Sequence, residues 1–197
     1  MSQFRVDDER FKECWRRAHY SYGTSEIFLK RAKSYRIRLN IISCLGVAVP
    51  MLIGGVVLTY GKDVKYLGAL IAVGAALGLS QLLLSGLSVI FGWPEALEYS
   101  LDSATENRAL SEKFRGLGIT ATDPLPDTEA SIRELIATDE ARRKQDAKRS
   151  VSDGELRRGH RAALRQFQKE CVECKNVPTD MSSTDCNVCG RFSWKRK

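Results

Sequence analysis

Two long stretches of this sequence contain no charged residue, and they constrain the fold more than any other feature. The first runs from Leu39 to Gly61 and the second from Tyr66 to Pro94, with a short charged connection between them. A helix needs about 20 mostly apolar residues to cross a bilayer, and each stretch is long enough. The sequence therefore predicts a two-helix transmembrane hairpin, with spans at 39–60 and 66–93. A soluble helical hairpin is the disfavoured alternative, because buried core helices seldom stay uncharged for so long.

Positive charge lies directly before the first predicted span. Five cations occur there without an acidic residue: Lys30, Arg31, Lys33, Arg36 and Arg38. Cytoplasmic flanks of membrane spans carry an excess of Lys and Arg, so this end is expected inside the cell. Two spans return the chain to the side from which it started. Both termini are therefore expected in the cytoplasm.

The chain divides into four predicted segments. Residues 1–38 form an amphipathic helix with one apolar face (Phe11, Trp15, Ala18, Tyr22), in which the polar run from Ser21 to Ser25 is a candidate break. The hairpin occupies 39–94, a helical cytoplasmic domain 95–170, and a cysteine-rich tail 171–197. The predicted fold class is an all-α membrane protein with a small C-terminal zinc knuckle or ribbon.

The cytoplasmic domain carries start and stop signals for three helices. The first is expected to span 95–115 and to end at Gly116 and Gly118, before a proline-containing linker at 119–127. The second runs from Asp127 to about Arg149. The third begins at Ser152, where a Ser-x-x-Glu sequence has the spacing of a capping box.

The second span carries one stripe of small and polar residues on an otherwise Leu-, Val-, Ile- and Ala-rich helix. Its members recur at steps of three and four: Gly74, Gly78, Gln81, Ser85, Ser88 and Gly92. Lipid supplies no hydrophobic reason for helices to associate, so small residues that permit close approach and interhelical hydrogen bonds drive their packing. Two interpretations stay open and are compatible: the stripe packs helices, or part of it faces a water-filled pore.

The first span has a weaker version of the same pattern, interrupted by a proline. Pro50 removes one helical hydrogen bond and predicts a kink, and Gly54 and Gly55 loosen the next turn. These three residues are candidates for a gating kink, although many kinks are only packing solutions. Neither span contains Asp, Glu, Lys or Arg. Coupled transporters usually need such a group, so an active transporter is disfavoured, whereas a passive pore is allowed. Two helices cannot enclose a pore, which predicts a homo-oligomer, with a tetramer favoured.

The tail contains two Cys-x-x-Cys pairs separated by eleven residues: Cys171, Cys174, Cys186 and Cys189. Each pair can chelate a metal from a tight turn, and four thiolates close a tetrahedral zinc shell. A structural zinc ion is therefore the expected cofactor, with mononuclear iron, a cluster and redox thiols as the alternatives. Gly190 follows the second pair, where a positive φ is expected.

The tail and the helices before it are strongly basic. Residues 95–140 carry four basic and eleven acidic residues, whereas residues 141–197 carry fifteen and seven. Phosphate neutralisation by Lys and Arg dominates nucleic-acid affinity. Attraction to anionic lipid headgroups and a merely solvated face remain as alternatives. The candidate ligand residues are Arg142, Arg143, Lys144, Lys148, Arg149, Arg157, Arg158, Arg161, Arg165 and Lys169. No phosphate loop or catalytic array is recognisable, so an enzyme is not expected.

The order of an amphipathic helix, a two-span hairpin, an exit at Trp93 and a helical tail resembles the SLATT family of bacterial two-transmembrane effectors. The CxxC-x11-CxxC tail is similar to the mobile-element-associated subgroup that this spacing defines. The resemblance implies a pore-forming effector of anti-phage defence in the bacterial inner membrane, paired with an enzyme that makes a nucleotide signal. One type, the Hailong systems, pairs a channel-like effector with a nucleotidyltransferase that makes single-stranded DNA oligomers, and such a partner would suit the basic tail of this chain.

The sequence and the resemblance together lead to one function hypothesis. The chain is expected to form an oligomeric ion channel, gated by a nucleotide or single-stranded oligonucleotide that an operon-encoded nucleotidyltransferase makes. The alternative is a non-conducting membrane anchor, whose zinc domain recruits a partner protein or nucleic acid. A membrane-tethered nucleic-acid-processing subunit is disfavoured, since no catalytic motif supports it.

Overall fold

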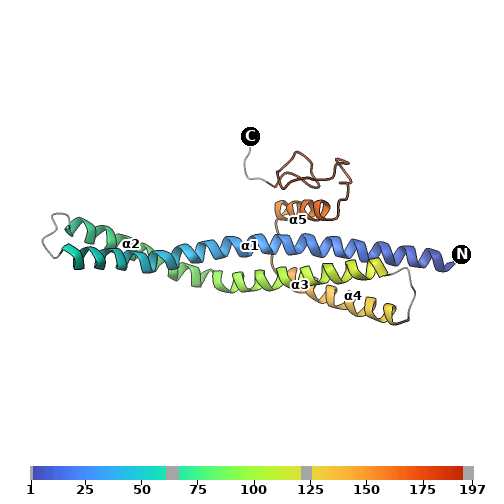
Figure 1. Ribbon diagram of the computed structural model, residues 1–197, viewed down its shortest axis with the longest axis horizontal. Helices are drawn as coiled ribbons and strands as arrows, with labels where there is room; N and C mark the ends of the chain where they lie inside the picture. Colours follow the sequence, from blue (N-terminus) through green and yellow to red (C-terminus); the bar gives the residue numbers. More distant parts are fainter. Residues whose placement is uncertain (1, 61–66, 121–125, 193–197) are drawn as a thin grey trace. The chain divides into compact units, whose positions relative to one another are not determined.

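The computed structural model describes residues 2–60, 67–120 and 126–192 (Figure 1). Within these ranges the regular secondary structure consists of α-helices, and the segments between and after them are turns and irregular chain. The prediction of an all-α chain is confirmed for these residues. The connection at 61–66 and the end of the predicted tail at 193–197 lie outside them. The helices are α1 (Ser2–Tyr60), α2 (Leu67–Ile90), α3 (Trp93–Thr120), α4 (Pro126–Asp146) and α5 (Asp153–Gln166).

The chain folds into two compact units. Unit 1 combines residues 1–30 with residues 100–197, and unit 2 comprises residues 31–99. Helices α1 and α3 each contribute residues to both units. Residues 1–30 are therefore part of the same unit as the helices that follow the hairpin.

The polar run from Ser21 to Ser25 does not break α1, contrary to the sequence-based expectation. The Thr24 and Ser25 hydroxyls donate to the carbonyls of Tyr20 (3.1 Å) and Tyr22 (2.9 Å), so their polar groups are satisfied inside the helix. Gly23 is needed for packing, because a Cβ there would lie 3.0 Å from the Gly159 carbonyl oxygen of α5. The hydroxyls therefore bond within α1, and the glycine permits the contact with α5.

The apolar core of unit 1 lies between α1, α3 and α4. It is made of Cys14, Ala18, Leu110, Phe114 and Leu135, all at least nine-tenths buried. Helix α3 continues through Gly116 and Gly118 to Thr120, so the predicted end near residue 115 is wrong. Gly118 is buried, and a Cβ there would lie 3.0 Å from the Trp15 indole nitrogen. The glycine therefore permits the close approach of α1 to α3.

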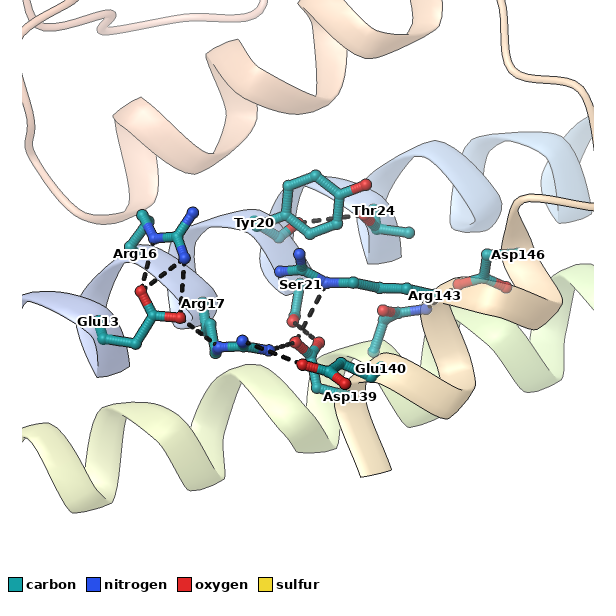
Figure 2. Close-up of polar contacts among 11 residues, drawn as sticks. Glu13, Arg16, Arg17, Tyr20, Ser21, Thr24, Asp139, Glu140, Arg143 and Asp146 are labelled. Carbon is teal, nitrogen blue, oxygen red and sulfur yellow. Dashed lines mark hydrogen bonds and ion pairs between the residues drawn. The ribbon is translucent and has the colours of Figure 1, made fainter. Parts of the chain in front are cut away.

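Buried ion pairs join α4 to α1 in the same unit (Figure 2). Asp139 of α4 has no solvent exposure and lies between two guanidinium groups. Arg17 donates to it at 2.6 Å from α1, and Arg143 lies 3.1 Å away on α4. The Ser21 hydroxyl donates to its second oxygen at 3.3 Å. Buried charges persist only when they are paired, and this carboxylate has both charge and hydrogen-bond partners.

A second polar cluster joins α4 to α3. Asp146 accepts hydrogen bonds from Ser103 at 2.8 Å and from Asn107 at 2.7 Å. Arg142 donates to Glu106 at 2.6 Å and to Asp102 at 3.1 Å. Helix α4 is therefore held to both of its neighbours by specific polar contacts as well as by apolar ones.

Unit 2 contains the second half of α1 together with α2. Two helical segments, Glu9–Val56 of α1 and Gly68–Ile90 of α2, are long and apolar enough to cross a membrane by length and composition. In unit 2, apolar side chains of both segments are exposed, including Met51 at 71% and Ile90 at 78%. Helix α2 ends at Ile90, and Gly92 adopts a left-handed φ of 60° in the turn before α3. Helix α2 thus ends three residues before residue 93, the predicted end of the second span.

Candidate metal centre

The four tail cysteines converge, with all of their sulfur atoms within 4.8 Å of one another. The Cys171 and Cys186 sulfurs are 3.8 Å apart, and those of Cys174 and Cys189 are 3.7 Å apart. Four sulfurs around zinc, each at about 2.3 Å in tetrahedral geometry, lie roughly 3.8 Å from one another. A disulfide would require about 2.05 Å. The predicted cofactor is confirmed as a structural zinc site held by these four residues.

Two similar turns present the cysteines. The Lys175 amide donates to the Cys171 carbonyl at 2.9 Å, and the Gly190 amide donates to the Cys186 carbonyl at 3.0 Å. The residues with left-handed φ are Lys175 and Arg191, so the expectation of a positive φ at Gly190 is wrong. Gly190 is required by space, because a Cβ there would collide with the Thr184 carbonyl oxygen. The described tail residues 171–192 contain no strand, which makes this module a knuckle.

Two side chains other than the cysteines brace the knuckle. Arg161 of α5 is 6% exposed and donates to Asp180 at its carbonyl (2.9 Å) and its carboxylate (3.1 Å). Glu173 joins the two turns by accepting from the Val188 amide at 2.9 Å. Sequence reasoning assigned Arg161 to a nucleic-acid ligand and did not identify Glu173, since both roles depend on residues far apart in the chain.

Thiol chemistry favours metal binding over redox activity. Burial, followed by the neighbouring thiols, raises the pKa of the Cys189 thiol above its ordinary value. Redox-active cysteines instead have a lowered pKa and partial exposure. Cys171 and Cys189 are also almost completely buried, at 0% and 1% exposure. A divalent cation supplies the positive charge that four neighbouring thiolates need.

Helix α5 connects the knuckle to α1. Its buried Leu164 packs against Cys171 and Cys189. On the other side, a Cβ at Gly159 would lie 2.6 Å from the Gly23 carbonyl oxygen, so the two helices cross with their backbones in contact. The predicted capping box at its start is confirmed, because Ser152 and Glu155 bond each other's backbone amides.

A cluster of aromatic rings and imidazoles fills the rest of the contact between α1 and α5. The Phe167 ring lies 5.9 Å from Trp15 and 5.8 Å from Tyr22 between ring centroids. His19 and His160 stack edge-on at 5.1 Å, and the Nε2 atoms of both are buried without a hydrogen-bond partner among the described residues. Burial, with His160 and Lys169 adding to it, lowers the pKa of His19 to about 4. Both imidazoles therefore stay neutral near pH 7.

The structure separates the predicted stripe of the second span into residues with contacts inside the hairpin and residues without them. Gly74 receives the Ile53 side chain of α1, and Gln81 occupies the space beside Gly46, where a Cβ would lie 2.5 Å from the Gln81 amide nitrogen. Ser88 is 5% exposed. These residues pack the hairpin internally, whereas a Cβ at Gly78 would meet no atom within 4 Å among the described residues. The remaining members are the half-buried Ser85 and Gly92, which lies in the turn beyond α2.

The kink candidates in the first span lie inside α1, whose helical assignment continues through Pro50. Pro50 is exposed, and Cβ atoms built on Gly54 and Gly55 meet no described atom within 4 Å. No contact thus explains either glycine. A role in gating stays a prediction.

The ten predicted ligand cations do not form one surface. Arg142 is 4% exposed and engaged with Asp102 and Glu106, and Arg161 braces the knuckle, so neither is available to an external phosphate. Three others lie against aromatic rings: Arg143 over Tyr20, Arg158 over Phe192 and Lys169 over Trp15. Arg157 lies 4.0 Å from Asp153. The more accessible members are Lys144, Lys148, Arg149 and Arg165, of which Arg149 is half-buried.

Comparison with known proteins gives one match. A family model described as mobilome CxxCx(11)CxxC protein matches residues 11–192. This range takes in α1, the hairpin, the buried contacts of unit 1 and the knuckle. No curated protein and no solved structure matches the chain.

Proposed function

We propose, on the premise that the chain belongs to the family of mobilome CxxCx(11)CxxC proteins, that it is an oligomeric membrane channel controlled by its zinc-stabilised unit. The observation that carries the proposal is the exposed apolar surface of the hairpin. Leu58, Leu79 and Ile90 are each more than three-fifths exposed. Soluble proteins rarely expose apolar surface on this scale, which a bilayer or other copies of the chain would cover.

The proposed pore requires several copies, because one helical hairpin encloses no channel. Gly74 and Gln81 pack within the hairpin, so the proposed lining shifts to the side of α2 that carries Gly78 and Ser85. A tetramer is the favoured assembly. The hairpin would lie in the bacterial inner membrane with both termini in the cytoplasm, as the cations from Lys30 to Arg38 suggest.

Control of the pore would run through the two continuous helices. Helices α1 and α3 both have residues in unit 1 and in the hairpin unit. In unit 1, the polar contacts of α4 and the docking of α5 hold parts of both helices. A nucleotide or single-stranded oligonucleotide that changes these contacts would therefore act on helices that continue into the spans.

The resemblance to SLATT effectors and Hailong systems suggests the biological setting. In it, a partner nucleotidyltransferase makes the signal, and the open channel depolarises an infected cell. The chain itself would have no catalytic role. Expression of the chain with the gene beside it should reduce phage plating, and deletion of residues 67–90 should abolish that protection. Protection that survives the deletion would remove the channel from the explanation.

Ion flux from proteoliposomes tests the channel directly. The purified chain should release a trapped fluorescent ion indicator in at least one of two conditions, without ligand or with short single-stranded DNA. In a Cys44→Ser background, a charged thiol reagent should block flux through Gly78→Cys or Ser85→Cys but not through Leu79→Cys, whose position is exposed on the hairpin. Absence of flux in both conditions would overturn the channel.

A membrane-anchored scaffold is the second candidate. The packing of Gly74 against Ile53 and of Gln81 beside Gly46 favours it, since these stripe residues already have a structural role inside one chain. A scaffold would give no flux but would bring a partner protein or nucleic acid to the membrane. Co-purification of the same partner with the wild type and with Ser85→Leu, without conductance in either, would identify it.

A further inference from the structure

A cavity of about 210 Å³ lies in unit 1 where the end of α4 and the segment leading to α5 meet α1. It is separate from the zinc site and from the hairpin. Its walls are largely apolar and also carry two arginines. The residues that line it are Tyr20, Thr24, Ile27, Phe28, Arg143, Asp146, Ala147, Arg149, Ser150, Val151 and Leu156.

Arg143 is the charged group best placed for a ligand in this cavity. Its guanidinium lies beneath the Tyr20 ring, 4.0 Å from the centroid, as Figure 2 shows. Its Nε atom faces Asp139 at 3.1 Å. Its terminal amino groups have no partner among the residues that the structure describes, and its side chain is 32% exposed. A guanidinium held against an aromatic ring keeps its hydrogen-bonding fork in place for a phosphate or carboxylate.

The local charge is otherwise balanced. Asp146 also lines the cavity, but Ser103, Asn107 and Arg142 already engage its carboxylate. Arg149 contributes a second cation to the wall. An anion entering the cavity would therefore meet two guanidinium groups and a neutralised carboxylate.

The size and the walls limit the rest of the ligand. Ile27, Phe28 and Leu156 contribute apolar surface to the walls of the cavity. Pockets for drug-sized molecules are roughly 300–1,000 Å³, so a cavity of 210 Å³ accommodates one ring system and not two stacked bases. Bases stack on aromatic rings and on guanidinium planes.

We propose that this cavity is the ligand site of unit 1 and that it binds one nucleoside phosphate unit, with the base against the apolar wall and the phosphate on Arg143 and Arg149. The proposal deepens the proposed function, on which its regulatory meaning rests. The unit is either a free mononucleotide or the terminal residue of an oligonucleotide. Because Arg143 also contacts Asp139, which Arg17 of α1 engages, binding would act on the contact between α4 and α1.

Equilibrium dialysis of the full-length, zinc-loaded protein in detergent tests the site without reference to conductance. The probes are radiolabelled deoxyadenosine monophosphate and the single-stranded hexamer of deoxyadenylate, with deoxyadenosine and inorganic phosphate as competitors. The monophosphate or the hexamer should bind saturably, and each competitor should be at least about tenfold weaker. Tighter binding of the hexamer would identify the oligonucleotide as the source of the unit.

Two variants address the cavity and two serve as matched controls. Leu156→Trp should fill it from a position that is 48% exposed, and Arg143→Lys should keep the charge beside Asp139 while removing the fork. Each should weaken binding at least about tenfold. Val172→Trp, at a site 72% exposed outside the cavity, and Arg133→Gln, at an exposed position of α4 that does not line the cavity, should stay within about twofold. Zinc content and the unfolding midpoint report correct folding.

The outcomes separate the site from the channel. Unchanged binding in Leu156→Trp and Arg143→Lys would overturn the cavity, even if liposome flux occurs. Saturable binding that both variants weaken would uphold the site even if flux is absent. Equal competition by inorganic phosphate would overturn the assignment to a nucleotide. Absence of binding by every probe at about 1 mM would overturn the proposal as a whole.

Discussion

The two units of this chain bury opposite kinds of side chain. Unit 1 encloses Asp139 completely and leaves Arg142 only 4% exposed, whereas the hairpin of unit 2 exposes Leu58 and Ile90 to more than three-quarters. In unit 1, these charged side chains can be buried because each has a partner. In the hairpin, apolar exposure is consistent with lipid as the solvent. The hairpin's surface matches the bilayer proposed for it, while unit 1 depends on particular pairs and on a metal.

Close approach of helices is the device that both units share. Gly23 and Gly159 bring α1 and α5 into backbone contact in unit 1, and Gly46 and Gly74 admit Gln81 and Ile53 in the hairpin. Small residues therefore work equally in both settings, because close packing is favourable in water and in lipid. The units differ in what supplements the packing. Four changes test how the two units differ, from the largest expected effect to the smallest. They are loss of the metal, removal of a buried charge, a change of pH and substitution of a glycine.

Loss of zinc should have the largest effect and should be confined to unit 1. Structural zinc contributes on the order of 10 kcal/mol of apparent binding energy, most of it used to order the segment that holds it. Cys189→Ser should abolish stoichiometric zinc and expose Leu164, which packs on Cys171 and Cys189. Metal analysis by mass spectrometry and hydrogen exchange of residues 167–192 measure both consequences.

Cys44→Ser is the matched control for the zinc experiment. Cys44 is exposed and lies in the hairpin unit, so the variant should keep its zinc and its protection from exchange. Peptides from residues 67–90 should exchange equally in all three proteins. Full zinc occupancy in Cys189→Ser, or deprotection that extends through α2, would contradict the assignment of the metal to unit 1 alone.

Removal of the buried carboxylate should be the next largest effect. Asp139→Ala leaves Arg17 and Arg143 without the charge they share at 2.6 and 3.1 Å. Breaking a buried pair by removing one partner costs about 3–5 kcal/mol. Glu140→Ala is the control, since Glu140 is 55% exposed and approaches Arg17 only at 3.5 Å, and its cost should stay below about 1 kcal/mol. Denaturant unfolding in nanodiscs compares them, and equal costs would show that Asp139 is dispensable.

Acid should weaken unit 1 through His19. Its pKa is about 4 in the folded chain against 6.5 for an ordinary histidine, so the unfolded state binds more protons between these values. This contribution to stability is complete above pH 6.5 and is lost as pH falls toward 4. The pKa of His160 is also lowered by burial, which reinforces the effect. Lys169 faces the same imidazole and opposes its charging.

His19→Phe isolates that contribution from the carboxylates that titrate over the same range. The stability difference between wild type and variant should change by up to about 3 kcal/mol between pH 6.5 and pH 4. Unfolding midpoints across this range provide the measurement. A difference that does not vary with pH would mean that His19 is not a buried neutral group.

The sequence predicted the local features of this fold better than its contacts. The four cysteines, the capping box at Ser152 and the length of the apolar helices are all set by short-range pattern, and each is present in the structure. The break at Ser21–Ser25 and the helix end at Gly116 were predicted wrongly. Gly23 and Gly118 disfavour helices by themselves, but their missing side chains permit contacts with α5 and with Trp15 of α1, which propensity does not record.

Two of the predicted ligand cations, Arg142 and Arg161, are buried in contacts that the sequence pattern did not indicate, for a related reason. A run of Lys and Arg indicates a phosphate surface only if the side chains reach solvent. Arg142 is instead neutralised by Asp102 and Glu106, forty and thirty-six residues earlier. Arg161 is held by Asp180, nineteen residues later. The acidic content of residues 95–140 was the available signal, because that many carboxylates require nearby cations in a compact unit.

The smallest predicted effect distinguishes two positions of the α2 stripe, Gly74 and Gly78. Gly74→Val should push against Ile53 and cost the hairpin about 1–3 kcal/mol, whereas Gly78→Val has space for its side chain within one chain. Hydrogen exchange of the amides of residues 67–90 in nanodiscs compares the two variants. The zinc content should remain unchanged in both. If Gly78→Val leaves the hairpin intact yet lowers liposome flux, Gly78 faces the pore or another copy. Equal destabilisation by both substitutions would instead place Gly78 in the hairpin's own contact, and the pore would need a lining from α1.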